Sequence, residues 1–185
     1  MARNIEIKAR IESVEALAER VAAIADEGPI VMFQDDTFFA CERGRMKLRA
    51  LSATEGQLIF YQRPNEKGPK ESCYIISPTA APDSLREALS LAYGQAGRVR
   101  KHRTLYVVGR ARVHLDRVES LGHFVELEVV LSEGEGTGPG IDEAQGLMTF
   151  LGISSAQLVN EAYVDLLAQS DPHKASVPST AIDDS

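Results

Sequence analysis

The chain has 185 residues, which suits one domain with a sizeable core. Its 27 acidic and 20 basic side chains give a formal net charge of -7, which disfavours nucleic acid as a partner. No segment has the roughly 18 consecutive apolar residues of a membrane span, and the first residues lack the charged and then apolar pattern of a signal peptide. We therefore expect a cytoplasmic protein that binds neither nucleic acid nor a membrane.

The segment at residues 3–11 alternates strictly between polar and apolar side chains. This period of two predicts a β-strand with one charged face and one apolar face. The charged face carries Asn4, Glu6, Lys8 and Arg10, and the apolar face carries Ile5, Ile7, Ala9 and Ile11. Taken alone, such a strand would be an ordinary amphipathic strand at a surface.

A helix is predicted after this strand, because Val14, Leu17 and Val21 recur at helical spacing. Ser13 can cap its start and the Gly28-Pro29 pair can end it. Strands are then predicted in meander order, with a loop over 64–69 that is rich in turn residues. The predicted strands in this part of the chain are 30–33, which leads into the segment 34–39, and then 45–49, 58–63 and 72–76.

The second half of the chain begins with a predicted helix over 82–94, in which Ser84 and Glu87 have the spacing of a capping box. Further strands, a glycine-rich connector and two more helices follow, and the composition after residue 170 predicts a disordered tail. In chain order these are strands 98–108, 110–116 and 123–131, the connector 133–140, and helices 144–151 and 154–166. We thus expect one domain over 1–169 and a tail over 170–185.

Several of these strands repeat the division into a charged and an apolar face. Counted over all of them, the charged faces hold ten of the chain's 20 Lys and Arg residues and four carboxylates. The cations are Lys8, Arg10, Arg45, Lys47, Arg49, Arg63, Lys101, Arg103, Arg110 and Arg112, and the carboxylates are Glu6, Asp116, Glu126 and Glu128.

Two arrangements of these faces are possible. In a closed sheet covered by helices, the charged faces would line an enclosed lumen, where clustered cations repel one another unless an anion lies between them. In an open sheet they would be solvated outer faces. The number of cations favours the closed sheet, since burying uncompensated charge is costly without a ligand. The lumen would suit a polyanion.

Short motifs along the chain resemble those of the CYTH superfamily, which includes class IV adenylyl cyclases and thiamine triphosphatases. The amino-terminal Glu-x-Glu-x-Lys motif of that family is present as 4–8, with Asn4 in place of the first glutamate. The similar segments are Asp36-Thr37-Phe38-Phe39, Gly44 to Arg49, Lys101-His102-Arg103 and Leu121 to Glu128, and the last of these resembles the cyclase branch.

The resemblance implies an α+β fold, in which an antiparallel eight-stranded β tunnel carries helices on its outside. It implies Mg²⁺ or Mn²⁺ as cofactor, held by Glu6, Glu126 and Glu128 with Asp116 as a ligand or its neighbour. It implies further that Lys and Arg side chains bind the triphosphate, and a homodimer is possible by analogy. The residues implied for triphosphate binding are Lys8, Arg45, Lys47, Arg49, Arg63, Lys101, Arg103, Arg110 and Arg112; of these, Lys8, Lys47, Arg49, Lys101 and Arg103 are the candidates for catalysis.

Three functions follow from the resemblance. The first is conversion of ATP to cyclic AMP and pyrophosphate. The second is hydrolysis of inorganic tripolyphosphate, thiamine triphosphate or a nucleoside triphosphate. The third is a non-catalytic triphosphate-binding module, which the replacement of the first glutamate by Asn4 would favour. His114 and His123 are expected to be spectators, and Tyr163 is expected in the core.

Overall fold

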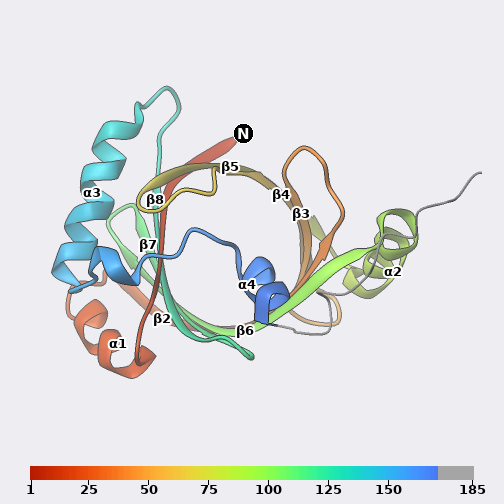
Figure 1. Cartoon of the computed structure of the whole chain (residues 1–185), viewed down its shortest axis with the longest axis horizontal. Coiled ribbons are helices and arrows are strands. Elements are labelled where there is room, and N and C mark those ends of the chain that lie inside the picture. The colour runs from red at the N-terminus through yellow and green to blue at the C-terminus, as the bar shows by residue number, and fades with distance from the viewer. Residues whose placement is uncertain (171–185) are drawn as a thin grey trace, which may run out of the picture.

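The architecture is a closed ring of antiparallel strands around a lumen (Figure 1). The computed structural model describes residues 1–170, and within them eight strands follow one another around the ring in the order β1-β5-β4-β3-β2-β6-β7-β8. The strands are β1 (Ala2–Arg10), β2 (Glu27–Phe39), β3 (Arg45–Ala50), β4 (Gly56–Gln62), β5 (Lys70–Thr79), β6 (Gln95–Val108), β7 (Ala111–Val118) and β8 (Gly122–Val130). The predicted α+β tunnel of eight antiparallel strands is confirmed.

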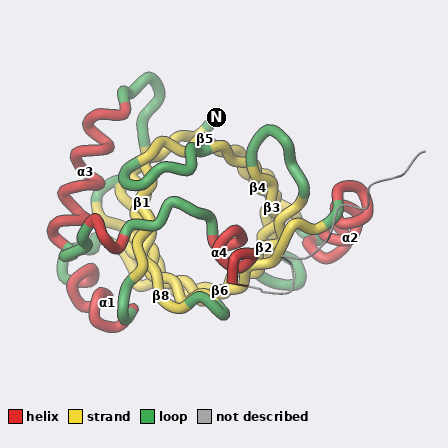
Figure 2. Tube along the Cα trace, viewed as in Figure 1, coloured by secondary structure: helices red, strands yellow, loops and turns green. Residues whose placement is uncertain are grey.

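The helices pack on the ring of strands (Figure 2). Helices α1 (Val14–Ala22) and α3 (Thr137–Phe150) cover β1, β7 and β8, and α2 (Pro82–Tyr93) covers β2 and β3. The Ser13 side chain caps α1 by accepting from the backbone N–H groups of Glu15 and Ala16. The last helix, α4 (Tyr163–Ser170), lies at one opening of the tunnel and contacts β6.

The main hydrophobic core lies outside the sheet, between its outer face and α1 and α3. In β1, Ile5, Ile7 and Ala9 are buried in this core, whereas the alternate residues line the lumen. A smaller core lies beneath α4, where Ala162 and Tyr163 pack against Phe124 and its neighbours. Strands β1, β7 and β8 therefore direct mainly apolar residues outward, toward α1 and α3, and mainly polar residues inward.

Several predicted boundaries were wrong. The first helix ends at Ala22, and the Gly28-Pro29 pair lies inside β2 instead of ending that helix. The predicted connector 133–140 is helical from Thr137, because α3 begins there. The predicted helix 154–166 is divided into a short 3-10 helix (Ser155–Gln157), an extended crossing and α4.

The predicted tail lies outside the described residues, except that Ser170 is the last residue of α4. Within residues 1–170, every helix is too short or too polar to cross a lipid bilayer.

The outer core predicts a mutational effect on stability. Leu127 in β8 is fully buried in this core, so Leu127→Ala should lower the free energy of unfolding by about 2–5 kcal/mol through lost burial and a residual cavity. Leu91 in α2 is 84% exposed, and Leu91→Ala should change the same quantity by less than about 0.5 kcal/mol. Urea denaturation of both variants measures this, and equal effects would contradict the placement of the core.

Candidate active site in the tunnel

The lumen contains a cavity of about 330 Å³ lined by side chains from all eight strands and from the start of α4. Among the described residues that line it, seven are Lys or Arg and four are Asp or Glu, an excess of three positive charges with neutral His. These charged residues are Glu6, Lys8, Asp36, Lys47, Arg49, Arg63, Lys101, Arg103, Arg112, Glu126 and Glu128. The cavity is therefore suited to an anion.

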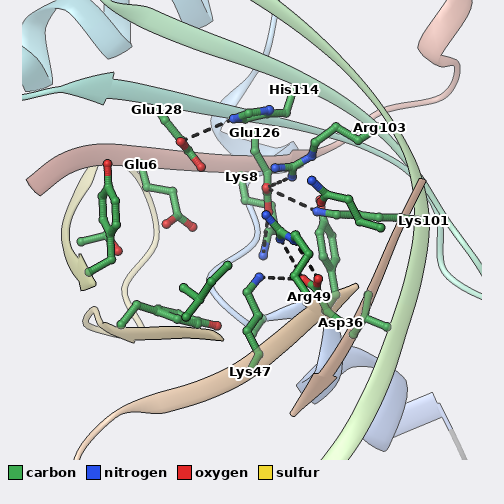
Figure 3. A pocket seen from close by; sticks show the side chains of 18 of the residues that line it. Glu6, Lys8, Asp36, Lys47, Arg49, Lys101, Arg103, His114, Glu126 and Glu128 are labelled. Carbon is green, nitrogen blue, oxygen red and sulfur yellow. Dashed lines mark hydrogen bonds and ion pairs between the residues drawn. The ribbon is translucent and has the colours of Figure 1, made fainter. Parts of the chain in front are cut away.

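Asp36 in β2 organises one group of cations (Figure 3). Its carboxylate accepts from Lys47 Nζ at 2.7 Å and from Arg49 Nε and Nη2 at 2.8 Å. Burial opposes ionisation of Asp36, but the charges of Arg49 and Lys47 outweigh it and hold the pKa of this carboxyl well below its usual range. The charged carboxylate fixes both cations at the cavity wall.

Asp116 in β7 fixes a second group of cations, although Asp116 itself does not line the cavity. It is fully buried and accepts from Lys101 Nζ at 2.9 Å, Arg103 Nε at 2.7 Å and the Tyr163 hydroxyl at 3.0 Å. The Tyr163 ring lies 4.1 Å from Lys8 Nζ and 4.9 Å from Lys101 Nζ, so it also supports two ammonium groups. Asp116 thus orients cations toward the cavity.

The three remaining carboxylates lie together on β1 and β8. Glu6 is directly opposite Glu128 in the register of these strands, and Lys8 is opposite Glu126. Each carboxylate has a basic partner, and Glu126 forms an ion pair with Arg103. Lys8 Nζ lies 3.3 Å from a Glu126 oxygen, Arg63 Nη1 lies 2.9 Å from a Glu6 oxygen, and Arg112 Nη2 and His114 Nε2 lie 3.1 and 3.4 Å from a Glu128 oxygen.

These carboxylates are chemically suited to a hard divalent cation, which prefers oxygen ligands. The buried Asn4 Oδ1 also lacks a hydrogen-bond partner and can offer a neutral oxygen on the same wall as Glu6. Within residues 1–170, however, no three acidic, His or Cys side chains are grouped closely enough to enclose a metal ion. The donor set fits Mg²⁺ or Mn²⁺ only if phosphate oxygens complete the coordination, which is the usual manner for Mg²⁺.

Three of the predicted site residues lie outside the cavity lining. Arg110 points away from the lumen and forms ion pairs with Glu135 and Glu143 on the outside of the ring. Arg45 forms a bidentate pair with Asp165 of α4 at 2.9 and 2.6 Å, and Asp116 supports cations as described. The structure brings the other predicted residues together around the lumen.

Other lining residues were missed by sequence reasoning. His114 lines the cavity next to Glu128 rather than standing apart, and Tyr163 contacts both Asp116 and the cavity. The signal for His114 was its alternation with Arg112 on one face of a strand. Asp36 belonged to a recognised motif without an assigned role. Gln34 and Tyr74 also line the cavity and had no motif to mark them.

Comparisons with known proteins agree with this geometry. The family model of the CYTH domain matches residues 2–163. The chain belongs to the CYTH family. An adenylate cyclase, CyaB from Aeromonas hydrophila, is 31% identical over 180 residues, which cover 90% of each chain.

Solved structures show the same fold at lower identity. The PH1012 protein from Pyrococcus horikoshii superimposes with a TM-score of 0.78 at 20% identity, covering 88% of this chain and 98% of the other. HpAC1 from Hippeastrum has a TM-score of 0.65 at 13% identity, covering 91% and 96%, and is described as having a dominant triphosphatase activity. At these identities the likeness concerns the fold alone.

The state of Lys47 predicts how anion binding depends on pH. Burial and the neighbouring Arg49 lower the pKa of the Lys47 ammonium to about 8, although Asp36 acts in the opposite direction. Below about pH 8 the Lys47 ammonium is charged and can pair with a phosphate. Above this pH Lys47 of the free protein is neutral, so phosphate binding must be accompanied by uptake of a proton. Affinity for tripolyphosphate should therefore fall above about pH 8, by up to about tenfold per pH unit.

Calorimetric titration from about pH 7 to pH 9.5 measures this dependence. Lys47→Arg should reduce this dependence, because a guanidinium stays charged throughout this range. Lys67→Arg, at an exposed position in the loop before β5, should leave it unchanged. A flat profile for the unmodified protein would contradict the assignment of Lys47 to the anion site.

Proposed function

We propose that this protein is an adenylate cyclase that converts ATP to 3',5'-cyclic AMP and pyrophosphate with Mg²⁺ or Mn²⁺. The observation that carries the proposal is the enclosed cavity with seven Lys and Arg residues against four carboxylates among the described residues. An excess of fixed cations is suited to a triphosphate and to the charge that develops on a leaving pyrophosphate. The identity of 31% with a bacterial adenylate cyclase supports the reaction type.

In this reaction the ribose 3'-oxygen forms a bond to the α-phosphorus, and the bond from that phosphorus to the bridging oxygen of the β-phosphate breaks. The hydroxyl proton is released to solvent, and the bond electrons leave with pyrophosphate. Lys47 and Arg49, held by Asp36, and Lys101 and Arg103, held by Asp116, would bind the phosphate oxygens. Guanidinium groups can bind two such oxygens at once.

Positioning and charge stabilisation account for most of this chemistry. The divalent ion, when bound through Glu6, Glu126 and Glu128, would supply neutralisation of the α-phosphate and a lower pKa for a coordinated hydroxyl. The protein itself keeps the triphosphate extended along the lumen, so that the leaving pyrophosphate is in line with the attacking oxygen.

The second candidate is a triphosphatase, in which water attacks in place of the ribose hydroxyl. Its support is that the cation groups around Asp36 and Asp116 need only the phosphate chain, and HpAC1, which has the same fold, is described with a dominant triphosphatase activity. A non-catalytic binding module is the third, because Asn4 stands where the family has a glutamate. In every case the partner is a small triphosphate compound.

A product assay tests the proposal. Purified protein is incubated with Mg²⁺ or Mn²⁺ and either ATP or tripolyphosphate, and cyclic AMP and orthophosphate are measured separately. The proposal predicts cyclic AMP and pyrophosphate from ATP. Orthophosphate release without cyclic nucleotide would replace the cyclase by the triphosphatase, and the absence of both products would leave a binding module.

Glu128 provides a test of whether the carboxylates on β1 and β8 bind the metal ion. Burial opposes ionisation of Glu128, but His114, Arg112 and Arg103 outweigh it and keep the pKa of this carboxyl well below its usual range, so it is charged at neutral pH. Glu128→Gln should reduce turnover on the order of 100-fold by removing one candidate metal ligand. Binding of tripolyphosphate without metal should be equal or tighter, since the cavity loses a negative charge.

The matched control is Glu133→Gln, at an exposed position after β8. It should change neither turnover nor binding. Unchanged turnover in Glu128→Gln would refute Glu128 as a metal ligand. Weaker tripolyphosphate binding without metal would show that the substitution has disrupted the structure of the cavity.

A further inference from the structure

His114 lies in the wall of the cavity without a hydrogen-bond partner. Val113 and Leu115, its neighbours in β7, are fully buried in the outer core, so the His114 side chain has to face the lumen. The residue is 6% exposed, and within residues 1–170 neither Nδ1 nor Nε2 of its ring has a hydrogen-bond partner. A buried polar group without a partner costs free energy, which a ligand in the cavity would recover.

The His114 ring lies beside the carboxylates of β8 (Figure 3). His114 is directly opposite Glu126 in the register of β7 and β8, and its Nε2 atom lies 3.4 Å from Glu128 Oε2. Arg112 Nη2 lies 3.1 Å from the same Glu128 oxygen. Carboxylates that bind metal ions are themselves usually held by such outer contacts, so Arg112 is placed to orient Glu128 next to the ring.

The separation of His114 Nε2 and Glu128 Oε2 fits two ligand atoms of one ion. Metal–ligand bonds of about 2.1 Å at right angles place neighbouring ligand atoms about 3 Å apart. A hydrogen-bonded nitrogen and oxygen usually lie about 2.9 Å apart, whereas these two atoms are 3.4 Å apart and are not joined by a hydrogen bond. The pair can therefore offer one nitrogen and one oxygen to the same ion, with phosphate oxygens and water as the other ligands.

We propose that His114 Nε2 binds the divalent ion together with Glu128, and that this nitrogen makes the site prefer Mn²⁺ to Mg²⁺. Mg²⁺ is bound through oxygen ligands, whereas imidazole is a favourable ligand for first-row transition metals. The inference rests on the metal dependence of the proposed function. It adds a ligand to the carboxylates and selects one of the two candidate ions.

Mn²⁺ allows a nitrogen ligand to be detected directly, by electron spin echo spectroscopy. The sample contains the protein, Mn²⁺ and bis(methylene)triphosphonate, an analogue of tripolyphosphate whose P–C–P bridges resist hydrolysis and which contains no nitrogen. The unmodified protein should show coupling of Mn²⁺ to an imidazole nitrogen, and His114→Leu should lose it. The control is His102→Leu, at an exposed position of β6 between the lumen-facing Lys101 and Arg103, which should keep the coupling.

Metal affinities measured by calorimetry with the same analogue test the preference between the ions. His114→Leu should weaken Mn²⁺ binding about tenfold and Mg²⁺ binding much less, and His102→Leu should change neither. Unchanged binding of the analogue to His114→Leu with EDTA present shows that the cavity has folded.

A measurement on the unmodified protein serves if His114→Leu does not fold. Labelling its histidines with ¹⁵N should change the coupling of Mn²⁺ from ¹⁴N to ¹⁵N. Among the histidines within residues 1–170, His114 is the one that lines the cavity, so this change identifies His114 as the ligand.

The proposal is overturned if the unmodified protein shows no nitrogen coupling, if a folded His114→Leu keeps the coupling, or if this variant weakens Mn²⁺ and Mg²⁺ binding equally. Its outcome is separate from that of the reaction. Nitrogen coupling through His114 without any cyclic AMP would keep the ligand and remove the cyclase. Cyclic AMP formation without nitrogen coupling would keep the cyclase and remove the ligand.

Discussion

The constraint on which the structure depends is charge compensation inside a closed sheet. Side chains that alternate along a strand must face either the helices or the lumen, and here the charged set faces the lumen. A buried charge is tolerated only with a partner. Asp36 and Asp116 meet this need by each holding one lysine and one arginine with short hydrogen bonds. The excess of cations left after this pairing is the feature that a polyanion would complete.

Because the lumen is polar, most of the hydrophobic stabilisation must come from the opposite face of the sheet. Residues such as Ile5, Val113 and Leu127 are fully buried beneath α1 and α3. This separation lets the interior contain charge without weakening the main core. Every strand is also hydrogen-bonded on both sides in the closed ring, so the sheet has no free edge.

Alternation in the sequence was sufficient to predict which side chains share a face, because the strand period is two and needs no tertiary information. It could not predict where a strand begins relative to its neighbours. Arg110 has the same parity as Arg112, yet it precedes β7, and its side chain turns to Glu135 and Glu143. Glycine-rich composition likewise hid the start of α3, whose Gly140 is required by the close approach of Ile5 and Leu131.

The segment before α4 shows that tertiary contacts can override helical periodicity in the sequence. Val159 N–H donates to the Lys8 carbonyl and Leu158 bridges to Ala9, so this stretch runs extended along β1 instead of forming the predicted helix. The same crossing brings the Glu161 carbonyl to 3.1 Å from Lys8 Nζ and places Tyr163 against two ammonium groups. The position of α4 at one tunnel opening and the orientation of the cations near it therefore have a common cause, the pairing of the crossing with β1.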